Sequence, residues 1–96
     1  MNEYQTLTES APVVLVEFFA TWCPHCRHMM PIVADVKERV VGLAEIYQLD
    51  IDKNSGLADA VGVSGVPTFI LYKGGREVWR QSGEIAEDEL LSRIER

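Results

Sequence analysis

The sequence FFATWCPHC, residues 18–26, holds the only two cysteines of the chain, Cys23 and Cys26, directly after an apolar run. Two cysteines at this spacing can close a small disulfide ring and open it again. Pro24 supplies a rigid turn between them and fits the first turn of a following helix, where a missing N–H is not needed. The unpaired N–H groups at the start of that helix would point at Cys23 and favour its thiolate. The stretch predicts a redox-active pair at a strand-to-helix turn.

Length and composition limit the class of protein. With 96 residues, of which 47% are hydrophobic, the chain is expected to fold as one domain over 1–96. A net charge of -6 argues against binding to nucleic acid or to anionic membranes, which need basic patches. The longest apolar stretch, residues 11–19, is shorter than the roughly 20 residues that a membrane helix needs. We therefore expect neither a nucleic-acid nor a membrane partner.

The amino-terminal residues, MNEYQ, are polar and acidic, and no secretory signal pattern precedes the apolar run. This favours a cytoplasmic protein, with a trimmed secretory signal as the alternative. Charge around the cysteines is expected to be locally positive. His25, Arg27 and His28 follow Cys23, whereas most acidic residues lie at 38–52 and 84–95.

The hydrophobic pattern predicts strands that alternate with helices. Near-continuous apolar residues over 13–19 indicate a central strand that is covered on both faces. A short helix over 1–10 would bury Tyr4 and Leu7. The remaining expected elements are a helix from 24 to about 41, a strand over 44–50 parallel to the first, a helix over 55–61, a hairpin of strands 66–72 and 77–81, and a helix over 88–94.

This order of elements around a Cys-Pro-His-Cys pair resembles the thioredoxin family over nearly the whole chain from about Pro12. Several separate motifs fall where that family has them: Trp22, Pro31, the Gly65-Val66-Pro67-Thr68 segment, Gly75 and Gly83. The resemblance implies an α/β fold, a minimal thioredoxin fold with a central mixed four-stranded sheet and helices on both faces. Because few residues precede Val13, we expect the family's first strand to be lacking and the strand over 44–50 to be an open edge.

The resemblance also implies an activity, that of a thiol–disulfide oxidoreductase or protein-disulfide reductase without a bound cofactor. Cys23 would be the exposed nucleophile, and Cys26 the more buried thiol that resolves the mixed disulfide. The implied partners are protein disulfides and a thioredoxin-reductase-like protein or small thiol as electron donor. Acidic residues at the open edge favour a monomer; they are Glu45, Asp50 and Asp52.

Glu17 is a carboxylate in an otherwise apolar strand. Its position resembles that of the family's buried acid, whose implied role is to take and return the Cys26 proton through water. The family usually has aspartate here, and the lysine that often accompanies it is replaced by Gln48. The alternative is a side chain that reaches an edge of the sheet and stays in water.

His25 lies between the cysteines, where an imidazolium or N–H donor would stabilise the Cys23 thiolate. The Pro-His pair resembles that of the periplasmic disulfide oxidases, although too few residues separate Cys26 from Pro67 for their helical insertion. It predicts a more oxidising protein than thioredoxins with Gly-Pro. The alternative is a polar residue on an exposed helix turn, which is what we expect of His28.

The segment around Val66 and Pro67 is the candidate substrate surface. It resembles the family's cis-proline site, which implies that the Val66 backbone lies beside Cys23 and pairs with an extended substrate peptide. Trp22 and Pro24 would flank the same surface, and Thr68 would complete it.

Two alternatives belong to other functional classes. One is a redox-inert binding module of thioredoxin fold that presents the Val66-Pro67 groove. The other is a metal-binding Cys-x-x-Cys protein in which His25 or His28 completes a zinc site. No second Cys-x-x-Cys is present and His25 would have to fold back, so we expect no metal.

Overall fold

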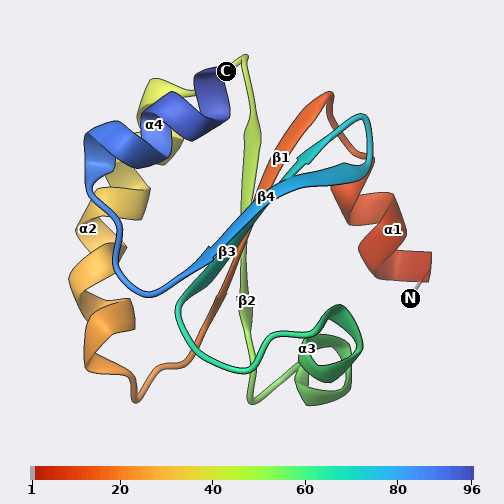
Figure 1. Cartoon of the computed structure of the whole chain (residues 1–96), viewed down its shortest axis with the longest axis vertical. Helices are drawn as coiled ribbons and strands as arrows, with labels where there is room; N and C mark the ends of the chain where they lie inside the picture. Colours follow the sequence, from red (N-terminus) through yellow and green to blue (C-terminus); the bar gives the residue numbers. More distant parts are fainter. Residues whose placement is uncertain (1) are drawn as a thin grey trace.

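The computed structural model describes residues 2–96, so Met1, the first residue of the expected amino-terminal helix, lies outside the described residues. Helices and strands follow one another in the expected order (Figure 1). They are α1 (Asn2–Thr8), β1 (Val13–Phe19), α2 (Pro24–Arg39), β2 (Glu45–Asp50), α3 (Ser55–Val61), β3 (Thr68–Lys73), β4 (Arg76–Ser82) and α4 (Glu87–Glu95). Among the described residues, no helix has the length and apolar character needed to span a lipid bilayer.

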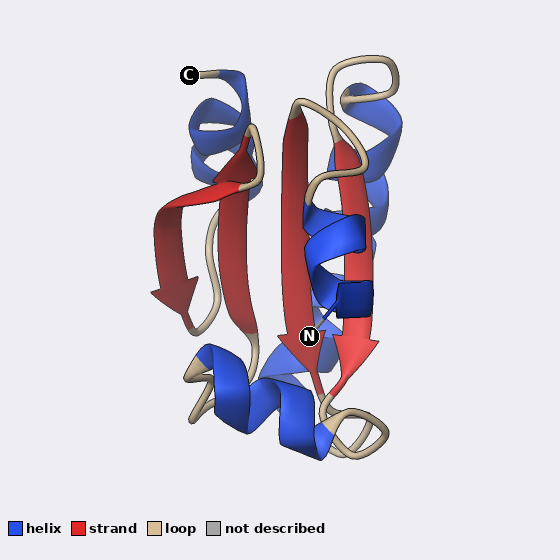
Figure 2. Cartoon of the chain, turned by 90° about the vertical axis from the view of Figure 1, so that its right-hand side faces the viewer, coloured by secondary structure: helices blue, strands red, loops and turns tan. Residues whose placement is uncertain are grey.

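The four strands form one mixed sheet in the order β2-β1-β3-β4. β1 pairs in parallel with β2, as expected, because α2 carries the chain back along the sheet between them. β1 also pairs antiparallel with β3, and β3 and β4 form the predicted hairpin. The expectation that β2 is an edge strand is confirmed. Figure 2 shows the sheet with α1 and α3 in front of it.

Helices cover both faces of the sheet, with α2 and α4 on one side and α1 and α3 on the other (Figure 1). Side chains alternate along β1, as in any strand. Leu15 packs with the buried residues of α2 and α4, whereas Val14, Val16 and Phe18 pack on the opposite face. Glu17 lies two residues after Leu15 and shares its face, so the central strand directs a carboxylate into the layer beneath α2.

Helix α1 is anchored by a buried pair of phenol groups. The Tyr4 hydroxyl lies 2.6 Å from the Tyr72 hydroxyl of β3, and the two rings meet edge to face with centroids 5.9 Å apart. Tyr4 is buried as predicted, whereas Leu7 is only half-buried and Thr8 is buried in addition. A helix of 7 residues is marginal alone, so this contact and the packing of Leu7 help to hold α1 on the sheet.

Several element boundaries differ from the expectation by one or two residues. Helix α2 ends at Arg39 rather than near residue 41, and Gly42 follows in the left-handed region with φ +83°. Strand β3 begins at Thr68 rather than at residue 66, because Pro67 has no N–H to donate to the sheet. Val66 and Pro67 therefore belong to the loop between α3 and β3, and Val66 lies near Cys23.

Candidate active site

The two cysteines lie at the junction of β1 and α2. Cys23 is the N-cap of α2, and its Sγ accepts a hydrogen bond from the backbone N of Cys26 at 3.3 Å. Pro24 occupies the first turn, as predicted. Both cysteines are free thiols. Cys23 Sγ therefore lies at the positive end of the dipole of a 16-residue helix.

The exposure of the two sulfurs differs from the expectation. Cys23 is 4% exposed and Cys26 is 3% exposed, so the prediction of an exposed Cys23 is wrong, and Cys26 is buried to nearly the same extent. The reason is that the Val66 carbonyl oxygen lies 3.6 Å from Cys23 Sγ and accepts a hydrogen bond from it. The difference between the thiols lies in their surroundings instead. Burial raises the pKa of Cys26, and its hydrogen bond with Cys23 raises it further.

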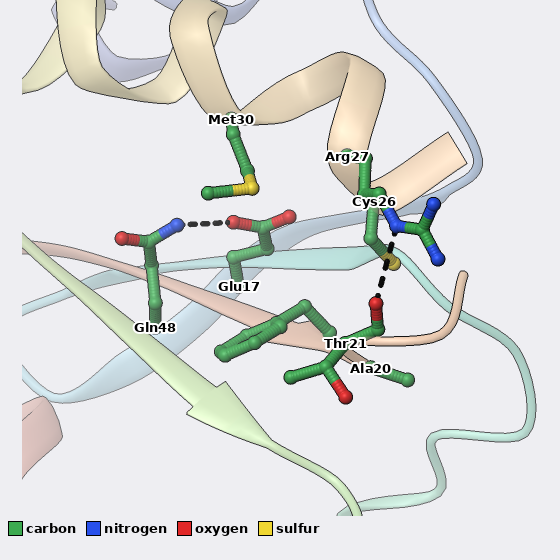
Figure 3. A pocket seen from close by; sticks show the side chains of 8 residues that line it. Glu17, Ala20, Thr21, Cys26, Arg27, Met30 and Gln48 are labelled. Carbon is green, nitrogen blue, oxygen red and sulfur yellow. Dashed lines mark hydrogen bonds between the residues drawn. The ribbon is translucent and has the colours of Figure 1, made fainter. Parts of the chain in front are cut away.

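Glu17 is 1% exposed and lies beneath α2, so the alternative of a side chain in water is wrong. Its Oε1 accepts a hydrogen bond from Gln48 Nε2 at 2.9 Å (Figure 3). Burial raises the pKa of the Glu17 carboxyl, and the Gln48 hydrogen bond lowers it by a smaller amount. Gln48 thus offers an N–H donor but no charge at the place where a lysine was the family expectation.

A pocket of about 360 Å³ lies between Glu17 and Cys26. Its lining includes Glu17, Cys26, Met30 and Gln48, and Figure 3 shows their side chains around it. Since a water molecule takes about 30 Å³ in the liquid, the pocket has room for several. Arg27 also lines it. A chain of water molecules can therefore link the Cys26 thiol to the Glu17 carboxyl.

The imidazoles of α2 contact a carboxylate from the far end of the chain. His25 Nδ1 lies 2.6 Å from Glu84 Oε2, and His28 Nδ1 lies 3.1 Å from the same oxygen. Hydrogen bonds from the two rings hold the pKa of Glu84 below its usual value. The expectation of locally positive surroundings is therefore incomplete, because a loop remote in sequence brings in a negative charge. The sequence offered one hint that Glu84 lies near the site, namely its position directly after Gly83.

The Val66–Pro67 peptide bond is cis, and the Val66 carbonyl lies beside Cys23 as expected. Thr68, by contrast, is 1% exposed. Its hydroxyl donates a hydrogen bond to the Gly65 carbonyl at 2.6 Å and lies 2.8 Å from Ser82 Oγ. Thr68 therefore stabilises the loop from the interior of the protein, and its buried side chain is not accessible to a substrate.

Trp22 and Pro24 are both exposed beside Cys23. Trp22 is 59% exposed, and its indole N–H donates a hydrogen bond to Asp52 Oδ2 at 2.9 Å. Asp52 was expected only as a charge at the sheet edge, but it orients the ring. Together the two side chains offer an apolar surface next to the nucleophile position.

Among residues 2–96, potential metal ligands converge at one place, which does not include the cysteines. The group comprises His25, His28 and Glu84. A zinc site built on Cys23 and Cys26 with a histidine therefore finds no support in the arrangement of the described side chains.

Comparison with known proteins agrees with this geometry. A family model described as Thioredoxin matches residues 2–96. Thioredoxin-2 of Saccharomyces cerevisiae is 41% identical over 83 residues, which cover 85% of this chain and 79% of that protein. Thioredoxin Y, chloroplastic, of Oryza sativa subsp. japonica is 33% identical over 91 residues, 95% of this chain and 54% of that protein. The chain thus spans about half the length of the chloroplastic relatives it matches.

Solved structures place the fold in the same group. The chain superposes on the structure of a thioredoxin point mutant from Halobacterium salinarum with a TM-score of 0.90 and 37% identity, covering 99% of this chain and 82% of that one. The expected mixed four-stranded sheet with helices on both faces is confirmed. The family match over residues 2–96, the relatives and the shared fold show that the chain belongs to the thioredoxin family.

Proposed function

We propose that this protein is a thiol–disulfide oxidoreductase that reduces protein disulfides with the Cys23–Cys26 pair. One observation carries the proposal: Cys23 Sγ is held at the start of α2, while Cys26 opens on the same pocket as the buried acid Glu17. Cys23 can then act as the attacking thiolate, and Cys26 has a proton acceptor in Glu17. Membership of the thioredoxin family supports the reaction class.

In the first step, the Cys23 thiolate attacks one sulfur of a substrate disulfide. The substrate S–S bond breaks, and a mixed disulfide forms between Cys23 and that sulfur. The other substrate sulfur leaves as a thiolate and takes a proton from water. The helix dipole and the Cys26 N–H stabilise the attacking thiolate before this step.

In the second step, Cys26 resolves the mixed disulfide. Its thiol passes a proton through pocket water to the Glu17 carboxylate, and its sulfur attacks Cys23 Sγ. The mixed disulfide breaks, and the second substrate sulfur leaves as a thiolate and takes a proton. Two electrons have moved to the substrate, and Cys23 and Cys26 are joined by a disulfide. A thioredoxin-reductase-like protein or a small thiol would return the two electrons.

The substrate would lie across the loop that covers Cys23. An extended peptide can pair with the backbone of Val66, which requires little of its sequence. Trp22 and Pro24 would contact its side chains, and Pro67 would support the loop from beneath. We place the reaction in a reducing compartment such as the cytoplasm, where an electron donor keeps the thiols reduced. The acidic edge strand β2 supports a monomer.

We also propose that His25 makes the pair more oxidising than a Gly-Pro thioredoxin, since a group that stabilises the Cys23 thiolate stabilises the reduced state. Replacing Pro24-His25 by Gly-Pro should lower the reduction potential by roughly several tens of mV. Titration in glutathione buffers measures it. An unchanged or higher potential would remove this role from His25.

Thiol labelling and protein-disulfide reduction test the function. Iodoacetamide, read out by mass spectrometry, should modify Cys23 first. Cys23→Ser should abolish reduction of a protein disulfide by the chain with a dithiol donor, and Cys26→Ser should accumulate a mixed disulfide. Faster labelling of Cys26 would reverse the two roles. If the wild type reduces no protein disulfide, the proposal is wrong, and the redox-inert alternative is favoured.

A further inference from the structure

Two imidazoles and one carboxylate meet on the surface beside the cysteine pair. His25 and His28 are three residues apart on α2, so their side chains project from the same side of the helix. Glu84 reaches them from the loop between β4 and α4. One possible ligand atom from each of the three residues lies within 4.8 Å of the other two. Three ligand atoms from two elements therefore converge on one point.

We propose that His25, His28 and Glu84 form a binding site for a divalent transition-metal ion, with Zn²⁺ as the ion that fits best. Imidazole nitrogens and a carboxylate oxygen are ligands that zinc takes in proteins, including sites with three protein ligands and one open position. Imidazole also suits Cu²⁺ and Ni²⁺, but Zn²⁺ has no geometric preference of its own and adapts to the ligands present. The site involves neither thiol.

Both distances from an imidazole nitrogen to the Glu84 carboxylate are close to those that a bound ion needs. Zinc binds nitrogen and oxygen at about 2.0–2.1 Å, which places tetrahedral ligand atoms about 3.3 Å apart. His28 Nδ1 is already 3.1 Å from Glu84 Oε2. His25 Nδ1, at 2.6 Å from the same oxygen, has to move outward by roughly 0.7 Å. The side chains of His25 and Glu84 are 67% and 40% exposed, so they can rotate and a hydrated ion can reach them.

The present hydrogen bonds use the same atoms that the ion would use. To donate to Glu84 Oε2, each imidazole carries a proton on Nδ1, whereas a metal ligand presents a lone pair there. Zinc binding would therefore replace two shared protons by one ion. Because both rings already converge on a single oxygen, the arrangement that holds the protons is preorganised for the cation.

Calorimetric titration with Zn²⁺ tests the site on the full chain with Cys23 and Cys26 both replaced by serine, so that no thiol can bind the metal. Circular dichroism checks that this background is folded. The chain has only two histidines, so imidazole NMR spectra report on this site alone. The result is independent of the redox proposal, because the background lacks the redox pair.

We expect one equivalent of Zn²⁺ to bind and both imidazoles to shift. His28→Asn and Glu84→Gln should each weaken binding at least about tenfold, since even residues that only support a metal ligand contribute about that factor. Glu89→Gln removes the same charge from an exposed position on α4 and should bind as the background does. Absence of binding would overturn the proposal, as would binding that both variants leave unchanged.

Discussion

Replacing Glu17 by glutamine should slow one step of the proposed reaction and leave the other unchanged. Burial and the hydrogen bond with Cys23 raise the pKa of Cys26 from 9.0 to about 12. That value belongs to the reduced pair; in the mixed disulfide Cys23 Sγ is bonded to the substrate, and burial is the main cause that remains. With the ordinary value of 9.0, only about one Cys26 thiol in 100 would be a thiolate at pH 7, and burial lowers this fraction further. The Glu17 carboxylate is the group in the pocket that can offset this depletion.

The expected loss in Glu17→Gln is at least about 100-fold in the rate at which Cys26 resolves a mixed disulfide, because an unassisted thiol is at most about one part in 100 thiolate at pH 7. This lies within the roughly 100- to 10,000-fold range of general base catalysis. Glutamine keeps the shape of the side chain but accepts no proton. The negative charge of Glu17 is the smallest of the causes that raise the Cys26 pKa, so its removal offsets little of the loss. Attack by Cys23 should be unaffected, because it precedes this proton transfer.

A symmetrical aromatic disulfide whose released thiolate absorbs visible light separates the two steps in stopped-flow mixing. Attack by Cys23 releases the first thiolate, and resolution by Cys26 releases the second. Cys26→Ser should show the first phase only and so identifies it. Glu17→Asp, which keeps a carboxylate, should recover part of the second phase.

The pH dependence adds a sharper check. An unassisted Cys26 forms about 100 times more thiolate at pH 9 than at pH 7, so the defect of Glu17→Gln should shrink as pH rises. A second phase that is as fast in Glu17→Gln as in the wild type would refute the role of Glu17. So would a defect that does not depend on pH, which would indicate a change in structure instead.

The remaining predictions concern stability, measured by urea unfolding. The folded chain binds the Glu17 proton more tightly than the unfolded chain, so this stabilisation is complete below the ordinary pKa of 4.5 and is lost as pH rises through the folded pKa. Glu17→Gln should therefore gain stability relative to the wild type as pH rises, and parallel curves would contradict this. Tyr4→Phe leaves the buried Tyr72 hydroxyl without its 2.6 Å partner and should lower the free energy of unfolding by about 1–3 kcal/mol. Adding Tyr72→Phe should then change little, whereas additive losses would show that the hydroxyls act independently. Leu90→Ala creates a cavity at a fully buried position and should lower the free energy of unfolding by about 2–5 kcal/mol. A loss below about 1 kcal/mol would mean that α4 packs loosely.

Most of the fold was predictable because its signals are local. The apolar run of β1 and the turn residues around Gly74 and Gly75 depend on neighbouring residues only, and the helix over 55–61 was predicted with its observed bounds. The start of β3 was missed because a pattern of apolar residues does not show where hydrogen bonding to the sheet begins. Pro67 determines that point.

The site was predictable where its parts lie close in sequence or in register. Cys23, Cys26 and Glu17 belong to one strand-to-helix unit, and alternation along β1 places the acid beneath α2. The burial of Cys23 was missed because it depends on a carbonyl of a distant loop. Glu84 was missed for the same reason, since 59 residues separate it from His25.

The edge position of β2 bears on the pocket around Glu17, because Gln48 of this strand is part of the pocket lining. β2 is hydrogen-bonded to β1 alone, and Gln48 lies on it opposite Glu17 in the strand register. Edge strands open locally at a lower free energy than central strands, in events that amide hydrogen exchange detects. Fraying of β2 would swing the Gln48 amide away and admit bulk solvent to the carboxyl, while β1 and β3 stay paired. The rate at which β2 opens locally would then determine how fast Glu17 exchanges its proton with solvent between turnovers.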